Sequence, residues 1–95
     1  MTDLNTAIVD FLGWKSQPDE FGGGHSWFQY DKSGKLLDIQ EWRPDYEHDA
    51  RLYMALYFEL PVGDRVHLAE SCTLESFGHY VCLCFCKLKG IEVVG

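Results

Sequence analysis

The chain has 95 residues, 46% of them hydrophobic and 15% aromatic, so it can fold as one domain over residues 1–95 with a modest core. Its 15 acidic residues outnumber its 8 lysines and arginines, which gives a net charge of -7 and makes direct nucleic-acid binding unexpected, because phosphates require clustered bases. A membrane span is not expected either, since the charge-free run Phe77 to Cys86 has only about half of the roughly 20 residues needed.

The residues Met1 to Asn5 have neither the basic region nor the apolar stretch of a secretory signal, so we expect the protein in the cytoplasm. The cysteines at 72, 82, 84 and 86 are then expected to be reduced thiols that pack as small apolar groups. A zinc site formed by these thiols with His79 is the alternative, but Cys-x-Cys within a strand suits zinc poorly. We therefore expect no metal and no other cofactor.

The first predicted element is a helix over residues 3–12, which Thr2 or Asp3 caps and Gly13 follows as a left-handed residue. Its apolar residues at helical spacing are Leu4, Ile8, Phe11 and Leu12.

A glycine-rich connector over residues 15–24 precedes a predicted β-hairpin over residues 25–42. The triplet Gly22 to Gly24 lacks the lysine and the serine or threonine that complete a phosphate-binding loop, which favours a plain connector. Asp31 to Gly34 has the composition of the tight turn between the two strands.

A second helix is predicted over residues 45–60, between Pro44 and Pro61. Apolar residues cover about two-thirds of its circumference, whereas a helix covered on one side needs a stripe of about 100°. The stripe consists of Tyr46, Ala50, Leu52, Tyr53, Leu56, Tyr57 and Leu60, and Met54 and Phe58 extend it sideways. We expect this surplus to be covered on two sides by other elements or by a partner.

Two further strands are predicted over residues 64–73 and 79–88, and a short edge strand over residues 90–94. A helix ending at Gly90 is the alternative for 79–88, but its Tyr, Val, Cys and Phe are better strand formers. Both of its faces are apolar, which is typical of a central strand. The elements together predict an α+β fold: a small antiparallel sheet of four or five strands with two helices packed against it.

Two segments carry a family resemblance. Leu4 to Trp14 reads as a helix that closes on Gly-Trp, and Pro44 to Ala50 reads as a Pro-x-Tyr-x-x-Asp start of an apolar helix. Together they resemble the phage ABA sandwich domain family, small phage-encoded proteins of largely unassigned function. The resemblance implies a phage or prophage origin and a bacterial cytoplasm as the setting, and neither motif is catalytic.

No predicted set of residues assembles an active site, so we expect the protein not to be an enzyme. Asp45, His48 and Asp49 share one helical face at metal-ligand spacing, but acids that complement the helix dipole are the favoured interpretation. A nucleophile pair of Cys72 and His79 lacks the helix N-terminus or basic neighbour that would lower the thiol pKa.

The charge distribution points instead to protein binding. Residues 1–49 hold ten acids and four bases, and residues 50–95 hold five acids and four bases. An acidic cluster is formed by Asp38, Glu41, Asp45, Glu47 and Asp49. It is interpreted either as a solubilising surface or as a patch that docks on a basic partner, with Trp42, Tyr46 and Phe21 as aromatic anchors.

The favoured hypothesis is a phage-type inhibitor that covers a basic, nucleic-acid-binding surface of a host defence enzyme, as anti-CRISPR proteins do. The predicted partner-binding residues are Asp38, Glu41, Trp42, Asp45, Tyr46, Glu47, Asp49, Met54 and Phe58. A second hypothesis is a small-ligand or nucleotide-binding module built on the glycine loop with Trp27, Phe28 and Tyr30. A third is a structural homodimer that buries the surplus apolar arc of the second helix.

Overall fold

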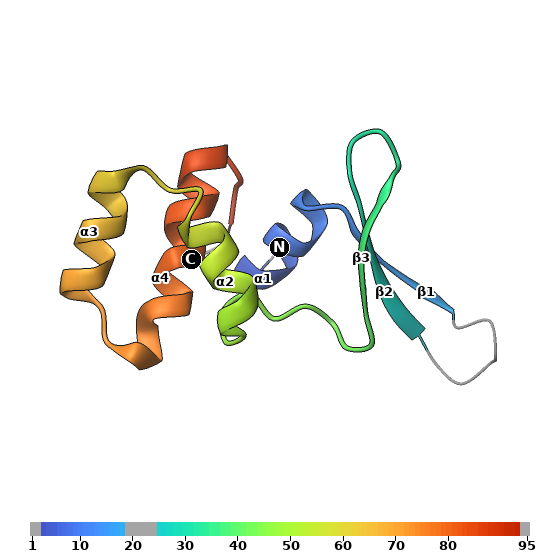
Figure 1. The fold of residues 1–95 in the computed structure, drawn as a ribbon, viewed down its shortest axis with the longest axis horizontal. Coiled ribbons are helices and arrows are strands. Elements are labelled where there is room, and N and C mark those ends of the chain that lie inside the picture. The colour runs from blue at the N-terminus through green and yellow to red at the C-terminus, as the bar shows by residue number, and fades with distance from the viewer. Residues whose placement is uncertain (1–2, 19–24, 94–95) are drawn as a thin grey trace.

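The computed structural model describes residues 3–18 and 25–93 of the chain. These residues form, in order, α1 (Leu4–Phe11), β1 (Trp14–Pro18), β2 (His25–Tyr30), β3 (Leu36–Gln40), α2 (Ala50–Tyr57), α3 (Val62–Ser71) and α4 (Leu74–Lys89). The α+β class is confirmed, but the described sheet has three antiparallel strands in the order β1-β2-β3 rather than four or five. The helices lie at one end of an elongated molecule of 46 × 28 × 26 Å and the sheet lies at the other (Figure 1).

The predicted strands over residues 64–73 and 79–88 are wrong, because these segments form the helices α3 and α4. The prediction relied on intrinsic propensities, which differ by less than about 1 kcal/mol per residue and yield to tertiary packing. Gly90 ends α4 with a φ of 71°, as the helical alternative for this segment predicted. Residues 91–93 of the predicted edge strand over 90–94 are irregular.

Helix α4 forms the centre of the helical half of the molecule. Its residues Val81, Cys82, Phe85 and Cys86 are fully buried, and α1, α2 and α3 all pack against it. The helix α1 contributes Ile8 and Val9 to the same core, and Asp3 caps it by accepting the Thr6 N–H at 2.7 Å. One face of α4 is therefore the surface against which the other three helices pack.

This packing accounts for most of the surplus apolar arc of the second helix. Leu52 and Leu56 are buried in the core, and Tyr53 and Tyr57 pack against the ring of Phe77 in α4, with ring centroids 5.8 and 5.4 Å away. Helix α4 is thus the main element packed against the second helix. Coverage on two sides, by other elements or by a partner, stays a prediction, since Phe58 is 65% exposed.

The second helix begins later than predicted, at Ala50 rather than at residue 45. The Asp45 carboxylate accepts the backbone N–H groups of Glu47 and His48, which gives this turn a local alternative to helical hydrogen bonds. Asp49 is the N-cap and accepts the Arg51 N–H at 3.1 Å.

The connector predicted over residues 15–24 begins as a strand, since Trp14–Pro18 pairs with β2. Its residues Lys15 to Pro18 show no apolar alternation, and the backbone ladder alone defines this edge strand. Residues 19–24, which include Phe21 and the glycine triplet, lie outside the described part of the chain. The predicted hairpin over 25–42 is confirmed as β2 and β3, with Gly34 at a φ of 88° in the turn.

The sheet joins the helices through a short connection at Gly13, which has a φ of 82°. The Tyr30 N–H donates to the Gly13 carbonyl at 3.0 Å, and the Gln29 amide donates to the Leu12 carbonyl at 3.2 Å. Strand β3 lies apart from the core, and its Leu37 and Ile39 keep 54% and 53% of their surface exposed.

The tight contact at Gly78 gives a first prediction. A Cβ at this position would clash with the carbonyl oxygen of Glu47 and lie 2.7 Å from Cδ2 of the Tyr53 ring. We expect Gly78→Ala to lower the free energy of unfolding by about 2 kcal/mol or more in urea titrations, because α4 must move away from its neighbours. Gly63→Ala is the matched control, since no atom lies within 4 Å of its added Cβ. It should be neutral or stabilising by about 0.5 kcal/mol, and equal losses in both variants would contradict the prediction.

Candidate protein-binding site

Residues 41–49, here called the acidic loop, connect β3 to α2 and carry most of the predicted site. The loop is irregular, yet α1 holds it firmly. The Asn5 Nδ2 donates to the Pro44 carbonyl at 2.8 Å, and the Tyr46 N–H donates to the Asn5 Oδ1 at 2.8 Å. Pro44 between these bonds is fully buried. The backbone of the loop is therefore fixed at its centre, although it belongs to no helix or strand.

Tyr46 is the main attachment of the loop, and its prediction as a surface anchor is wrong, because only 3% of its surface is exposed. Its hydroxyl accepts the Trp14 indole N–H at 2.8 Å, and its carbonyl accepts the Cys82 thiol at 3.2 Å. Burial raises the pKa of the phenol, and the hydrogen bond from Trp14 opposes this shift. Tyr46 thus joins the sheet, the loop and α4 from inside the molecule.

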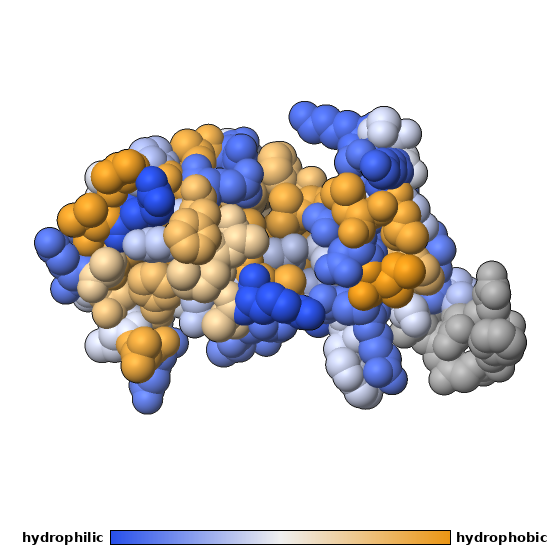
Figure 2. All heavy atoms as spheres, in the orientation of Figure 1, coloured by the Kyte–Doolittle hydropathy of each residue, from blue (hydrophilic) through white to orange (hydrophobic). Residues whose placement is uncertain are grey.

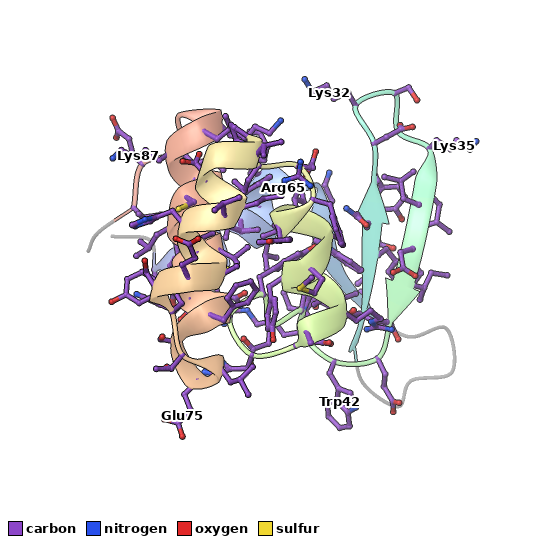
Figure 3. All side chains as sticks on the ribbon, turned by 60° about the vertical axis from the view of Figure 1, so that its left-hand side comes forward. Lys32, Lys35, Trp42, Arg65, Glu75 and Lys87 are labelled. Carbon is purple, nitrogen blue, oxygen red and sulfur yellow. The ribbon has the colours of Figure 1, made fainter. Side chains whose placement is uncertain are left out.

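Trp42 has the opposite placement, with 77% of its surface exposed. Figure 3 shows its side chain projecting away from the body of the molecule. The Gln40 amide donates to its carbonyl at 2.7 Å, and the neighbouring Arg43 guanidinium donates to the Thr6 hydroxyl of α1. An exposed tryptophan on a fixed backbone, next to the carboxylate of Glu41, is typical of a protein-binding surface.

Three carboxylates of the predicted cluster make local pairs. Asp45 lies 2.9 Å from the Nδ1 of His48, and Glu47 lies 3.1 Å from the Nδ1 of His79. Asp49 lies 3.6 Å from the Arg51 guanidinium. Only the pair of Asp49 with Arg51 joins a carboxylate to a guanidinium group; the other two partners are histidines.

The other two carboxylates lie at or near the sheet. Asp38 accepts the N–H of its neighbour Ile39 at 2.8 Å, and Glu41 forms no ion pair within the described residues. Residues 38–51 hold five carboxylates and two guanidinium groups, so the region is negative. Lys32 and Lys35 lie at the far tip of the hairpin (Figure 3), which separates basic from acidic groups.

Met54 and Phe58 do not join the acidic loop, although the sequence analysis grouped them with it. Met54 is half-buried beside a groove between α2 and the turn from α3 to α4. Phe58 follows the C-terminal end of α2, with its ring 5.5 Å from that of Tyr57 and 65% of its surface exposed. The structure thus separates the predicted site into three surfaces and removes Tyr46 from it.

The four cysteines are free thiols. Burial raises the pKa of Cys82, Cys84 and Cys86, which keeps these thiols protonated and poorly nucleophilic. His79, the other residue of the zinc alternative, pairs with Glu47. Within residues 3–18 and 25–93, no three His, Cys, Asp or Glu side chains are grouped so as to hold a metal ion.

The aromatic residues of the ligand-binding hypothesis do not share one face of the sheet. Phe28 and Tyr30 alternate with Trp27 along β2, so Trp27 points to the opposite side, where it packs against the core. The Tyr30 hydroxyl accepts a hydrogen bond from the Gln17 amide at 3.3 Å. The hypothesis sets these residues beside the glycine loop, which lies outside the described residues, so it stays a prediction.

Asn5 holds the acidic loop in place and Gly78 lets α4 approach it closely, and neither residue is among the predicted site residues. Asn5 bonds residues about 40 positions away, and no local pattern announces such a contact. The sequence did contain a signal for the contact at Gly78, because a glycine within an apolar run indicates a close approach of another segment.

Comparison with protein-family models, with curated proteins and with solved structures finds no match to this chain. The resemblance to the phage family therefore stays a prediction. Among the described residues, no helix is both long and apolar enough to cross a membrane.

The hydrogen bond between Trp14 and Tyr46 gives a second prediction. Tyr46→Phe leaves the buried indole N–H of Trp14 without its acceptor, so we expect a loss of about 1–3 kcal/mol in the free energy of unfolding, measured in urea. Tyr80→Phe is the control, because this half-exposed tyrosine should tolerate the change within about 0.5 kcal/mol. Equal effects of the two substitutions would show that the bond adds no stability.

The buried thiol of Cys82 gives a third prediction, on pH. Because its pKa is raised in the folded chain, the unfolded chain ionises first, from the ordinary thiol value of 9.0 upward. The contribution of the neutral Cys82 thiol to the free energy of unfolding is thus fully present below pH 9. Above pH 9 it falls by up to about 1.4 kcal/mol per pH unit. We expect the stability difference between the wild type and Cys82→Ala to shrink as the pH rises from about 8 to 10.5 in urea titrations with a reducing agent. A constant difference over this range would contradict the prediction.

Proposed function

We propose that the protein is a non-enzymatic binding protein whose acidic loop, together with Asp38, docks on a basic surface of another protein. One observation carries the proposal: Trp42 is 77% exposed on a backbone that Asn5 and Tyr46 hold in place. A large aromatic side chain on a preorganised loop loses little conformational freedom on binding, so more of its burial contributes to affinity.

The charge around Trp42 supports a basic partner. Five carboxylates and two guanidinium groups in residues 38–51 attract a positive surface, and this attraction accelerates association and selects against acidic partners. The same field repels nucleic acid itself. A protein whose basic groove normally binds nucleic acid is therefore a suitable partner, since it offers a positive surface and is not itself a nucleic acid.

Within this proposal the protein acts as an inhibitor, because occupying such a groove excludes the nucleic acid. The specific setting that we propose is a phage-encoded inhibitor of a host defence enzyme in the bacterial cytoplasm, analogous to anti-CRISPR proteins. The resemblance of Leu4 to Trp14 and of Pro44 to Ala50 to the phage family supports this setting.

The fourth prediction concerns partner capture by the full chain immobilised through its C-terminus and exposed to a bacterial lysate. We expect a basic nucleic-acid-binding protein to be retained at about 50 mM salt and released at about 500 mM, because salt screens surface charges. Added duplex DNA should also release it, since both ligands occupy one surface. Trp42→Ala should weaken binding of the isolated partner by about thirtyfold, as loss of an aromatic interface anchor does.

Val62→Ala serves as the control, because Val62 is an apolar residue of α3, outside the loop, with 65% of its surface exposed. It should bind the partner like the wild type. Capture that resists salt, DNA and Trp42→Ala alike would overturn the proposal.

A further inference from the structure

A second surface lies between α2 and the turn from α3 to α4. It is a groove of about 320 Å³, large enough for one or two apolar side chains. Its principal lining residues are Tyr53, Met54, Ala69, Cys72, Leu74 and Phe77. Figure 2 shows apolar and weakly polar side chains gathered over this helical half of the molecule. The acidic loop lines no part of the groove.

The floor of the groove is preformed and one of its walls is adaptable. Tyr53 and Phe77 meet edge to face, with their ring centroids 5.8 Å apart, and the ring of Tyr57 lies 5.4 Å from that of Phe77. Met54 is half-buried, and its unbranched side chain can adjust to different apolar shapes. The groove therefore combines a rigid aromatic base with a flexible edge, as peptide-binding grooves do.

Leu74 forms the rim of the groove with 94% of its surface exposed, the largest fraction among the large apolar side chains described. It is the first residue of α4, a position that any polar residue could occupy. Its exposed side chain adds little to the free energy of folding, whereas its burial against a ligand would contribute to affinity.

The charge around the groove selects the kind of ligand. Glu70 and Glu75 are exposed next to Ala69 and Leu74, and no described cation lies within ion-pair distance of either carboxylate. The base that adjoins the groove in sequence, Arg51, pairs with Asp49. Glu70 and Glu75 do not line the groove, but each directly follows a residue that does. An apolar groove with unpaired carboxylates next to its lining residues favours an apolar segment with lysine or arginine beside it.

We infer that this groove binds an amphipathic, basic segment of another protein, with apolar side chains against Tyr53 and Phe77 and its cations near Glu70 and Glu75. This recognition corresponds to an amphipathic helix lying in a hydrophobic groove. It does not rest on the function proposed for the acidic loop, because the two surfaces use different residues.

The fifth prediction tests this inference with a synthetic amphipathic peptide of leucine and lysine, about 14 residues or four helical turns long. Its twin, with every lysine replaced by glutamate, tests the charge. We expect the lysine peptide, titrated into the isotope-labelled full chain, to shift the amide NMR signals of Ala69 and Leu74, and the glutamate peptide to leave them unchanged. Shifts confined to residues 41–49 would overturn the inference and leave the function proposed for the loop untouched.

Variants separate groove binding from general attraction to an acidic protein. Leu74→Ser should lower the affinity for the lysine peptide by about tenfold. Leu88→Ser, at the other end of α4, should leave this affinity unchanged. Glu70→Gln combined with Glu75→Gln should weaken binding and flatten its salt dependence. The charge-matched pair Glu59→Gln with Glu92→Gln should retain it, and equal effects of the two pairs would overturn the inference.

Sedimentation equilibrium of the free protein tests the competing occupant, a second copy of the chain. We expect a mass that Leu74→Ser does not change. A dimer that Leu74→Ser dissociates would assign the groove to self-association and overturn the inference.

Discussion

The structure depends on the buried junction around Tyr46. Its hydroxyl accepts the indole N–H of Trp14 from the sheet, its N–H bonds Asn5 of α1, and its carbonyl accepts the thiol of Cys82 in α4. These bonds lie where water is largely excluded, and an unsatisfied polar group there would be costly, so each partner constrains the others. One residue of an irregular loop therefore connects the sheet to the helices, and the position of the loop follows from the core rather than from its own sequence.

This arrangement explains how a small domain can present an irregular binding surface without a flexible loop. Pro44 and Tyr46 face inward, so the residues beside them, Trp42 and the carboxylates Asp45 and Glu47, lie at the surface. Asp49 pairs with Arg51, whereas the partners of Asp45 and Glu47 are histidines, so the patch keeps an excess of carboxylates over guanidinium groups. Shape and the exposed tryptophan thus contribute as much to the proposed recognition as charge does.

The helical half shows why a segment that is apolar on both faces is difficult to assign. Residues 79–88 contain strand-forming residue types, and a run of apolar residues at consecutive positions has no periodicity that separates strand from helix. The structure places Val81, Cys82, Phe85 and Cys86 at helical spacing in the core, and Gly78 lets α4 approach the backbone at Glu47. The apolar arc on the second helix, by contrast, is buried at Leu52 and Leu56, and α4 is the main element that packs against it.

From the sequence alone, three features could be established: the α+β class, the first helix with its Asp3 cap and Gly13 end, and the β2–β3 hairpin with its turn at Gly34. These depend on local patterns, namely apolar spacing, capping residues and turn composition, which act over a few residues. Only the tertiary structure decided that Tyr46 is buried while Trp42 is exposed, that residues 62–89 form two helices, and that Met54 and Leu74 border one groove. Each of these outcomes is set by contacts between residues distant in the chain, and the free energy of burial in such contacts exceeds the small local preferences that a sequence displays.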